Sequence, residues 1–386
     1  MYKKEMTWRI RVYGIVQGVG FRPTVSRHAT AHGIYGTVCN KGPYVEIYAQ
    51  GEKEKIEGFL NELKENPPKR AAILKINIED ITAENELYFE TFDIIESEKT
   101  KGEIFVSPDI AICDECKKEL FDPKDRRYLH PFINCTCCGP RLTILDALPY
   151  DRERTSMKEF PMCPNCAKEY TDEKSRRFDA QPVCCNECGP EVYLIGRKEH
   201  GREAITYTRK LISEGKIVAI KGIGGFHLCC DATNEEAVKR LRILKKRPAK
   251  PFAVMAKDET VVKQECLVTK EQEAILTGHQ KPILLLDKEG NGKLAPSVAP
   301  GNPKVGVMLP YAPVQLLIFQ YDDGIKMPEF LVMTSGNTSG APICRDDEEA
   351  AEELSYLCDC ILPNYHICVM RCYLITERLG SVRMTR

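Results

Sequence analysis

The first hundred residues change between two hydrophobic periods. Apolar and polar side chains alternate over residues 8–16, which predicts a strand, and short strands are expected at 36–39 and 45–49. Apolar residues at 56, 59, 60 and 63 recur at helical spacing, and another helix is expected at 23–32, where proline occupies the first turn. Strands at 73–81 and 88–94 complete the order βαββαβ, which is the split-βαβ or ferredoxin-like pattern.

Beyond about residue 201 the pattern is again a mixture of helices and strands, over longer stretches. Helices are expected at 204–213 and 234–244, and strands at 217–220, 252–255, 283–286, 305–309 and 330–334. A glycine-rich segment, 222–225, follows the first of these strands. The simplest architecture for this order is a twisted sheet, mixed or parallel, with flanking helices.

Between these regions lies a block of cysteines in four Cys-x2-Cys pairs. The spacing repeats at an offset of 50 residues, and the members are Cys113, Cys116, Cys135, Cys138, Cys163, Cys166, Cys185 and Cys188. Eight thiolates at this spacing predict two structural Zn²⁺ ions with four sulfur ligands each. The spacing allows local pairing (first pair with second) and nested pairing (first with fourth). Cys137 and Cys184 break the pattern and His130 has no counterpart at position 180, so none of them is expected to be a ligand.

Composition narrows the class of protein. The chain has 386 residues, 43% of them apolar, which is enough for two or three domains. We divide it at 1–97, 98–198 and 199–386. A net charge of −1 argues against a protein built around nucleic-acid phosphates. Neither an apolar run near 20 residues nor a secretory leader is recognisable, and 19 cysteines indicate a reducing compartment, so no membrane association and a cytoplasmic location are expected.

A glycine-rich loop joins the first strand to the first helix, with Arg22 at its end. Backbone N–H groups, a helix N-terminus and a guanidinium can together bind an oxyanion. The phosphate-binding loop is expected to consist of Gln17, Gly18, Val19, Gly20, Phe21 and Arg22. This run, together with residues 36–40, resembles the acylphosphatase signature, and the resemblance covers residues 7–95. It implies that Arg22 binds the phosphate and that Asn40 positions the attacking water, without a metal or a covalent intermediate.

A second group of polar residues lies in the C-terminal region. The segment 244–252 contains Lys246, Arg247 and Lys250 beside two prolines, and Thr334, Ser335 and Asn337 end a predicted strand. These motifs resemble the YrdC-like family, whose members make threonylcarbamoyl adenylate from ATP, bicarbonate and threonine. The resemblance implies that these six residues, with Lys221, bind ATP (with Mg²⁺, as substrate) and a carbamate-like group. His227 either lines this pocket or is a packed histidine. A P-loop lysine motif is missing from the sequence.

The three modules in this order resemble the hydrogenase-maturation carbamoyltransferases. The expected fold class is therefore a multidomain α+β and α/β chain, with a ferredoxin-like acylphosphatase domain, two four-cysteine zinc fingers and a YrdC-like sheet domain. The resemblance implies hydrolysis of carbamoyl phosphate, adenylation of the carbamate by ATP, and transfer to the C-terminal cysteine of a partner maturation protein, for the cyanide ligand of a nickel–iron hydrogenase. The family's further transferase domain is expected to be missing here, because the chain stops at Arg386, and residues 365–374 also depart from the family's pattern.

Two alternatives remain open at this point. The first is threonylcarbamoyl-adenylate synthesis for tRNA modification, although the acylphosphatase-like module has no role in that pathway. The second is a non-catalytic zinc protein that presents Arg126, Arg127, Arg176 and Arg177 to RNA, double-stranded RNA included. The near-neutral net charge weighs against RNA binding.

Overall fold

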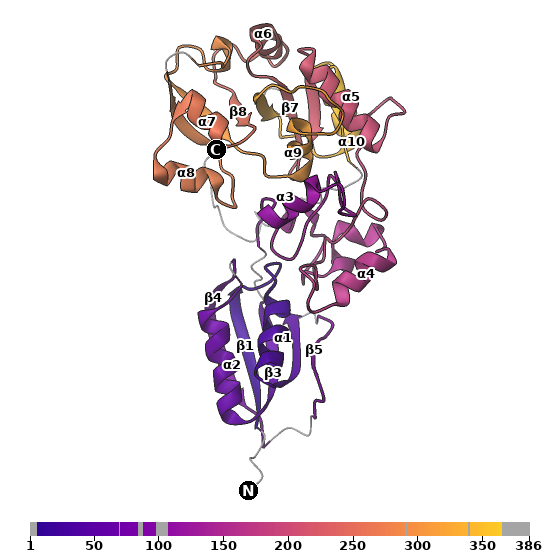
Figure 1. The fold of residues 1–386 in the computed structure, drawn as a ribbon, viewed down its shortest axis with the longest axis vertical. Helices are drawn as coiled ribbons and strands as arrows, with labels where there is room; N and C mark the ends of the chain where they lie inside the picture. The colour runs from indigo at the N-terminus through magenta and orange to yellow at the C-terminus, as the bar shows by residue number, and fades with distance from the viewer. Residues whose placement is uncertain are drawn as a thin grey trace.

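The computed structural model describes residues 6–68, 70–83, 88–97, 107–289, 292–338 and 340–364. Three modules follow one another along the long axis of the molecule (Figure 1), with the N-terminal module at one end, the cysteine block in the middle and the C-terminal module at the other end. The divergent stretch 365–374 lies outside the described residues. No helix in the described ranges is long and apolar enough to cross a membrane.

The N-terminal module confirms the βαββαβ order. Its elements are β1 (Met6–Ile15), α1 (Phe21–Ala31), β2 (Tyr35–Lys41), β3 (Tyr44–Gly51), α2 (Lys53–Glu65), β4 (Ala72–Asp80) and β5 (Phe92–Ile94). The sheet order is β4-β1-β3-β2-β5, and α1 and α2 pack against a core that includes Ile10, Val38 and Phe59. β5 is shorter than the expected 88–94, because it pairs with β2 over three residues only and Tyr88 is 75% exposed.

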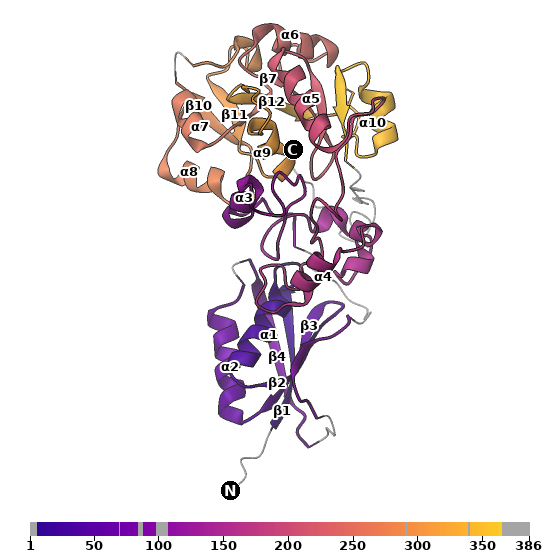
Figure 2. The ribbon, with the colours of Figure 1, turned by 45° about the vertical axis from the view of Figure 1, so that its right-hand side comes forward.

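The middle module consists mainly of turns around two short helices, α3 (Asp114–Phe121) and α4 (Pro164–Thr171). It also contains 3-10 turns at Leu142–Ile144, Arg152–Arg154 and Ser156–Glu159. We call residues 113–138 the first finger and residues 163–188 the second finger. In Figure 2, α3 lies against the C-terminal module and α4 lies beside the N-terminal module.

The C-terminal module is a mixed sheet, which confirms the expected architecture. Its helices are α5 (Gly201–Ser213), α6 (Glu235–Leu244), α7 (Glu259–Glu265), α8 (Lys270–Thr277), α9 (Pro313–Phe319) and α10 (Asp347–Leu354). Its strands are β6 (Val218–Lys221), β7 (Phe226–Asp231), β8 (Ala253–Ala256), β9 (Cys266–Leu267), β10 (Leu284–Lys288), β11 (Lys304–Met308), β12 (Phe330–Ser335) and β13 (Cys360–Leu362). The order is β13-β6-β7-β12-β8-β11-β10-β9, with parallel pairing at β13–β6 and β8–β11.

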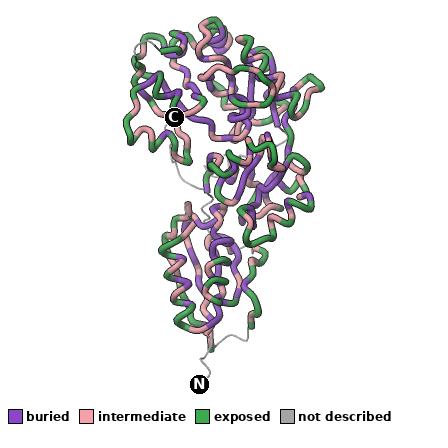
Figure 3. The backbone as a smooth tube through the Cα atoms, in the orientation of Figure 1, coloured by how far each residue is buried: buried purple, intermediate pink, exposed green. Residues whose placement is uncertain are grey.

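Buried positions follow the strands of both sheets and continue through the middle module (Figure 3). One apolar cluster joins Leu120 and Leu129 of the first finger to Ile220 and Leu331 of the C-terminal sheet. The second finger instead forms a small cluster of its own, which includes Ala180 and Val183. The first finger therefore shares its core with the C-terminal module, whereas the second finger does not.

Candidate functional site

The loop between β1 and α1 is a tight turn that the middle module covers. Gly18 and Gly20 have φ values of 69° and 76°, the left-handed region that glycine adopts without strain. A Cβ atom on Gly20 would lie 2.7 Å from the Cγ2 of Thr136, and one on Gly18 would lie 3.1 Å from the Cδ of Arg141. Glycine is thus required here both by the turn and by the close approach of the first finger and the turn that follows it.

Arg141 ties this loop to the first finger. Its side chain is buried, and its Nε donates to the carbonyl of Gly18. Its other four N–H groups donate to carbonyl oxygens of the cysteine knuckle, those of Cys135, Thr136, Cys138 and Pro140. Since all five donors are used, one side chain links the phosphate-loop backbone to the backbone of a metal-binding turn.

The cavity beside this loop contains two oxygen atoms without partners. Asn40 is 1% exposed and Gln17 is 3% exposed, and within the described residues neither Asn40 Oδ1 nor Gln17 Oε1 has a hydrogen-bond partner. Both residues line a cavity of about 20 Å³ together with Arg22. That volume suits one water molecule, and a water donates to such acceptors. The role of Asn40 in positioning a water stays a prediction.

Arg22 lies at the start of α1, and its guanidinium is buried between modules. Its Nη1 donates to Oδ1 of Asp151 at 2.9 Å, and its Nε lies 3.0 Å from Oδ2 of Asp179. Burial alone would lower the pKa of Arg22, but the charges of Asp179 and then Asp151 raise it overall. These carboxylate partners come from the middle module, and the sequence offered no local signal for them.

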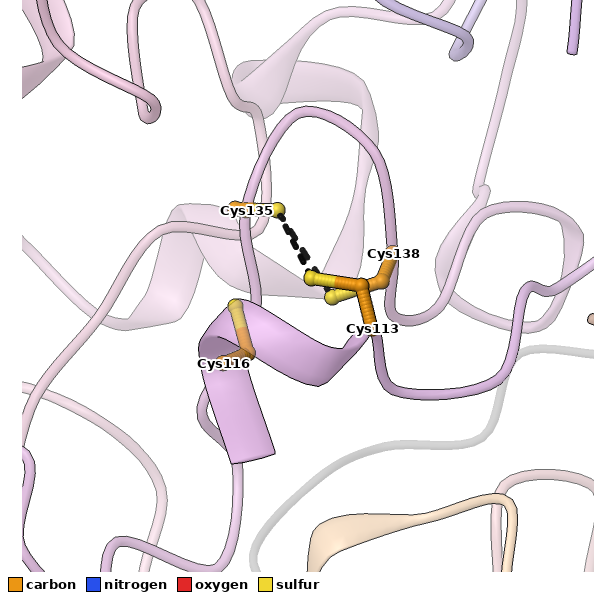
Figure 4. Close-up of side chains that lie close together, drawn as sticks. All are labelled: Cys113, Cys116, Cys135 and Cys138. Carbon is orange, nitrogen blue, oxygen red and sulfur yellow. Dashed lines mark hydrogen bonds between the residues drawn. The ribbon is translucent and has the colours of Figure 1, made fainter. Parts of the chain in front are cut away.

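The eight predicted cysteines form two compact groups. Cys113, Cys116, Cys135 and Cys138 make one group (Figure 4) and Cys163, Cys166, Cys185 and Cys188 make the other, with sulfur atoms within 4.8 Å of one another in each. Pairing is therefore local, and nested pairing is wrong. Four thiolates closing on one point are the donor set of a structural Zn²⁺ site.

The cysteines and histidine that were expected to be bystanders lie outside both groups. Cys137 is exposed and Cys184 is buried. His130 packs between Asn186 and Cys184, at 2.9 Å and 3.3 Å, and burial lowers its pKa to about 3.

The arginines of each finger bind the other finger. Arg126 Nη2 donates to Sγ of Cys166 at 3.0 Å, and Arg127 pairs with Glu169. Fifty residues further on, Arg176 Nη2 donates to Sγ of Cys116 at 3.5 Å, and Arg177 pairs with Glu119. These guanidinium groups are used inside the module, so the RNA-binding alternative loses its candidate contacts.

The C-terminal motif residues gather at the end of β12. Arg247 Nη1 donates to Oγ1 of Thr334 at 3.3 Å, and Ser335 Oγ donates to Oδ1 of Asn337 at 2.8 Å. The cation that completes this group is Lys245, whose Nζ donates to Oδ1 of Asn337 at 2.9 Å and to two nearby carbonyls. Burial, with a smaller contribution from Arg247, lowers the pKa of Lys245 to about 8.

Lys245 was not among the residues predicted from the sequence. Lys246 and Lys250, which were predicted, are both exposed. A signal was present in the helical period: Lys245 follows Leu241 by four residues and so continues the buried face of α6.

Lys221 and His227 lie at the same end of the sheet as Ser335, where β6 ends and β7 begins. Lys221 is 4% exposed and its Nζ pairs with Oδ1 of Asp347 at 2.5 Å. It lines a separate, largely apolar cavity of about 50 Å³ between the middle and C-terminal modules. His227 faces Ser335 across the β7–β12 ladder, and burial lowers its pKa to about 4, so the ring is neutral at pH 7.

Comparison with known families assigns each module. The acylphosphatase family model matches residues 8–94, and the HypF finger model matches 112–145 and 162–195. The Sua5/YciO/YrdC model, described as telomere recombination, matches residues 210–372. An acylphosphatase of Thermotoga maritima is 40% identical over 87 residues, which are 22% of this chain and 92% of that protein.

Longer relatives match nearly the whole chain. Carbamoyltransferase HypF2 of Cupriavidus necator is 44% identical over 94% of this chain and 47% of its own length, and a probable carbamoyltransferase HypF of Methanocaldococcus jannaschii is 43% identical over 99% and 50%. A crystal structure of full-length HypF in a phosphate- and nucleotide-bound form superposes with a TM-score of 0.89 at 46% identity, covering 95% of this chain and 47% of that one. T. kodakarensis HypF gives a TM-score of 0.86 at 44% identity, covering 94% and 46%.

The chain spans about half the length of the curated relatives that it matches. Its modules nevertheless carry the acylphosphatase, HypF-finger and YrdC-like matches in this order along the chain. The chain is thus homologous over nearly its whole length to HypF carbamoyltransferases, of whose length it matches about half.

Proposed function

We propose that this chain hydrolyses carbamoyl phosphate in its N-terminal module and forms carbamoyl adenylate from the released carbamate and ATP in its C-terminal module. The observation that carries the proposal is the presence of two separate cationic sites. One is built on Arg22 with buried unpaired oxygens beside it, and the other on Lys245 and Arg247 at the end of β12.

Hydrolysis in the N-terminal module needs a phosphate-binding group and a positioned water. Arg22 and the N–H groups of the loop 17–22 would bind the phosphoryl oxygens, and Asn40 Oδ1 would accept a hydrogen bond from the attacking water. Water attack would release inorganic phosphate and carbamate. Each step uses groups of this chain, and none calls for a covalent enzyme intermediate.

Adenylation in the C-terminal module needs positive charge beside the triphosphate. Lys245 and Arg247 would supply it, while Thr334, Ser335 and Asn337 would orient the phosphates or the carbamate. Magnesium bound to ATP would share the neutralisation. The carbamate oxygen attacks the α-phosphorus and pyrophosphate leaves. We retain Lys221, Lys246 and Lys250 as predicted contributors to binding of the same substrates.

Two zinc ions would hold the middle module in shape through the cysteine groups. The products would serve carbamoylation of a maturation protein at its C-terminal cysteine in the cytoplasm, for the cyanide ligand of a nickel–iron hydrogenase. Carbamoyl transfer is supported by the matched relatives, which are named carbamoyltransferases. The maturation protein and the hydrogenase rest on the family resemblance of the three modules alone.

The test is an assay of the purified chain with carbamoyl phosphate and ATP. We expect phosphate release with carbamoyl phosphate alone and pyrophosphate release when ATP is added. Arg22→Ala should abolish phosphate release and leave the zinc content unchanged. Lys245→Ala should abolish pyrophosphate release and leave phosphate release intact. If neither product forms with the unmodified chain, the proposal is wrong.

Threonylcarbamoyl-adenylate synthesis is the alternative that shares the C-terminal chemistry. No contact in the described structure favours threonine over carbamate. Pyrophosphate release with threonine and bicarbonate, and none with carbamoyl phosphate, would select that alternative.

A further inference from the structure

The guanidinium of Arg22 is almost fully engaged by groups outside its own helix. Asp179 takes one edge, with Oδ2 at 3.0 Å from Nε and Oδ1 at 3.4 Å from Nη2. Asp151 and Ser97 take Nη1, at 2.9 Å and 3.1 Å. A guanidinium has five N–H donors, so these contacts leave one Nη2 hydrogen for a ligand. A phosphate that binds in bidentate fashion must therefore replace one of these partners.

The two carboxylates are held very differently. The carboxylate of Asp179 is fixed by further hydrogen bonds. Its Oδ1 also accepts from Gln181 Nε2 at 2.8 Å and from the hydroxyl of Tyr170 at 3.3 Å. Its backbone is left-handed, with φ at 54°, a conformation that aspartate tolerates better than most residues. If the contact between Asp179 and Arg22 were lost, Gln181 and Tyr170 would still hold the Asp179 carboxylate in its position.

Asp151 has fewer partners than Asp179. Besides Arg22, its carboxylate meets only the Nη1 of Arg154, at 3.6 Å, among the ion pairs of the described residues. Together with Arg22 and Asp179, it lines a cavity of about 580 Å³ on the side of Arg22 that faces β5 and the second finger. A rotation of this side chain into the cavity would transfer its charge to water.

We propose that Asp179 is a positioning residue of the acyl-phosphate site and that Asp151 is the group that the phosphate replaces on Arg22. Asp179 occupies the Nε/Nη2 edge, which leaves the Nη1/Nη2 end for two phosphate oxygens. The inference rests on the proposed function, because it takes the ligand to be the phosphoryl group of an acyl phosphate. It adds that the second finger completes the site of the N-terminal module.

Electrostatics gives the two aspartates opposite effects on phosphate affinity. Asp179 fixes a flexible side chain in one orientation, so its loss should weaken binding. Asp151 competes for the same donors and would repel the incoming dianion, so its loss should strengthen binding. A purely structural role for either residue predicts neither the opposition nor any change confined to phosphate affinity.

The experiment uses the full chain with both metal sites loaded and inorganic phosphate as the probe. Isothermal titration should show that Asp179→Asn raises the dissociation constant about tenfold, the loss expected for one charge-assisted hydrogen bond. Asp151→Asn should lower it severalfold. In phosphate release from carbamoyl phosphate, KM should follow these directions, with smaller changes in kcat.

Asp146→Asn is the matched control, because it removes a surface carboxylate of the same module that pairs with Lys158 at 2.8 Å. It should change neither affinity nor KM. Zinc content and thermal midpoint are measured for every variant. If Asp179→Asn does not fold, Tyr170→Phe keeps the carboxylate and the ring but removes one donor to Asp179, and should weaken phosphate binding about two- to threefold.

Opposite shifts for the two variants support the inference. Equal shifts in one direction, or unchanged affinity in both, overturn it, and so does an unmodified chain that binds no phosphate. A chain that shows the opposite shifts but releases no phosphate from carbamoyl phosphate contradicts only the proposed function. A chain that releases phosphate with unchanged affinities in both variants contradicts only the inference.

Discussion

The two fingers have one backbone design and two different environments. Their helices begin directly after Cys113 and Cys163, and Leu129 and Asp179 occupy the same left-handed turn, with φ values of 55° and 54°. Leu129 is 4% exposed and packs in the core of the C-terminal module, whereas Asp179 contacts Arg22 of the N-terminal module. The same finger backbone thus packs an apolar side chain against the C-terminal module in one copy and places a carboxylate beside Arg22 of the N-terminal module in the other.

The comparison also shows that the fingers are not independent. Each supplies the arginine pair that binds the thiolates and the helix carboxylate of the other. Repetition of the sequence at an offset of 50 is therefore matched by reciprocal contacts in space. This division of roles predicts that damage to the two fingers has unequal consequences.

Loss of one metal ligand from each finger should give the largest difference. Cys135→Ser removes a sulfur from the finger that shares the C-terminal core, and Cys185→Ser removes the equivalent sulfur from the finger with its own small cluster. Each change leaves three of the four sulfur ligands and should reduce bound zinc from about two ions to one. Structural zinc contributes of the order of 10 kcal/mol to folding, so the finger that loses its ion should also lose stability. Only Cys135→Ser should also unfold the C-terminal module.

The measurement is zinc content combined with thermal unfolding and limited proteolysis. A C-terminal module that survives Cys135→Ser as well as it survives Cys185→Ser would show that the shared apolar cluster does not couple the first finger to it.

The next largest effect should come from Leu129→Asn. Asparagine keeps the left-handed turn, so the change tests packing alone, and burying an amide in place of a leucine should cost about 3 kcal/mol of unfolding free energy. Leu129→Met, which conserves volume, should cost less than about 1.5 kcal/mol. Denaturant unfolding measures both. Equal losses for the two variants would contradict a specific packing role for Leu129.

The reciprocal arginines should give a smaller, site-selective effect. Arg176→Ala should weaken zinc at the first finger, and Arg126→Ala at the second, by about 10- to 100-fold, the usual effect of removing a group that supports metal ligands. Zinc release to a chelator is measured in the chain with both cysteine groups intact, and alkylation of the released thiolates followed by peptide mapping assigns the affected site. Faster release from the finger that carries the mutated arginine would reverse the predicted pattern.

The hydrophobic pattern predicted the helices and strands in which apolar residues recur at regular spacing. It missed strands such as β7, in which the apolar residues do not alternate regularly with polar ones. The βαββαβ order follows from alternation, while β7 was missed because its apolar run continues directly from the glycines at 222–225 and was interpreted as part of a loop motif. Local cysteine pairing could not be derived, because local and nested pairing satisfy the same spacing.

The partners of Arg22 were beyond sequence reasoning for a different reason. Asp151 and Asp179 lie 129 and 157 residues away, and only the packing of modules brings them to Arg22. Lys245, one position before the predicted Lys246, also belongs to the C-terminal group. It was missed because the motif was aligned by residue type and the helical face of α6 was not considered.

The smallest predicted effect is a difference in pH dependence between the two cationic sites, that of Arg22 in the N-terminal module and that of Lys245 in the C-terminal module. Arg22 keeps its charge, because Asp179 and Asp151 raise its pKa overall, whereas burial lowers the pKa of Lys245 to about 8. Lys245 is protonated below that value and neutral above it, so kcat/KM for ATP in pyrophosphate release should fall as pH rises through about 8, by at most about tenfold per pH unit. Phosphate release from carbamoyl phosphate should not show this fall in activity at high pH.

The control is Lys245→Arg, which should remove the fall in kcat/KM for ATP, since arginine stays charged. If kcat/KM still falls through about pH 8 in Lys245→Arg, the group that titrates is not Lys245.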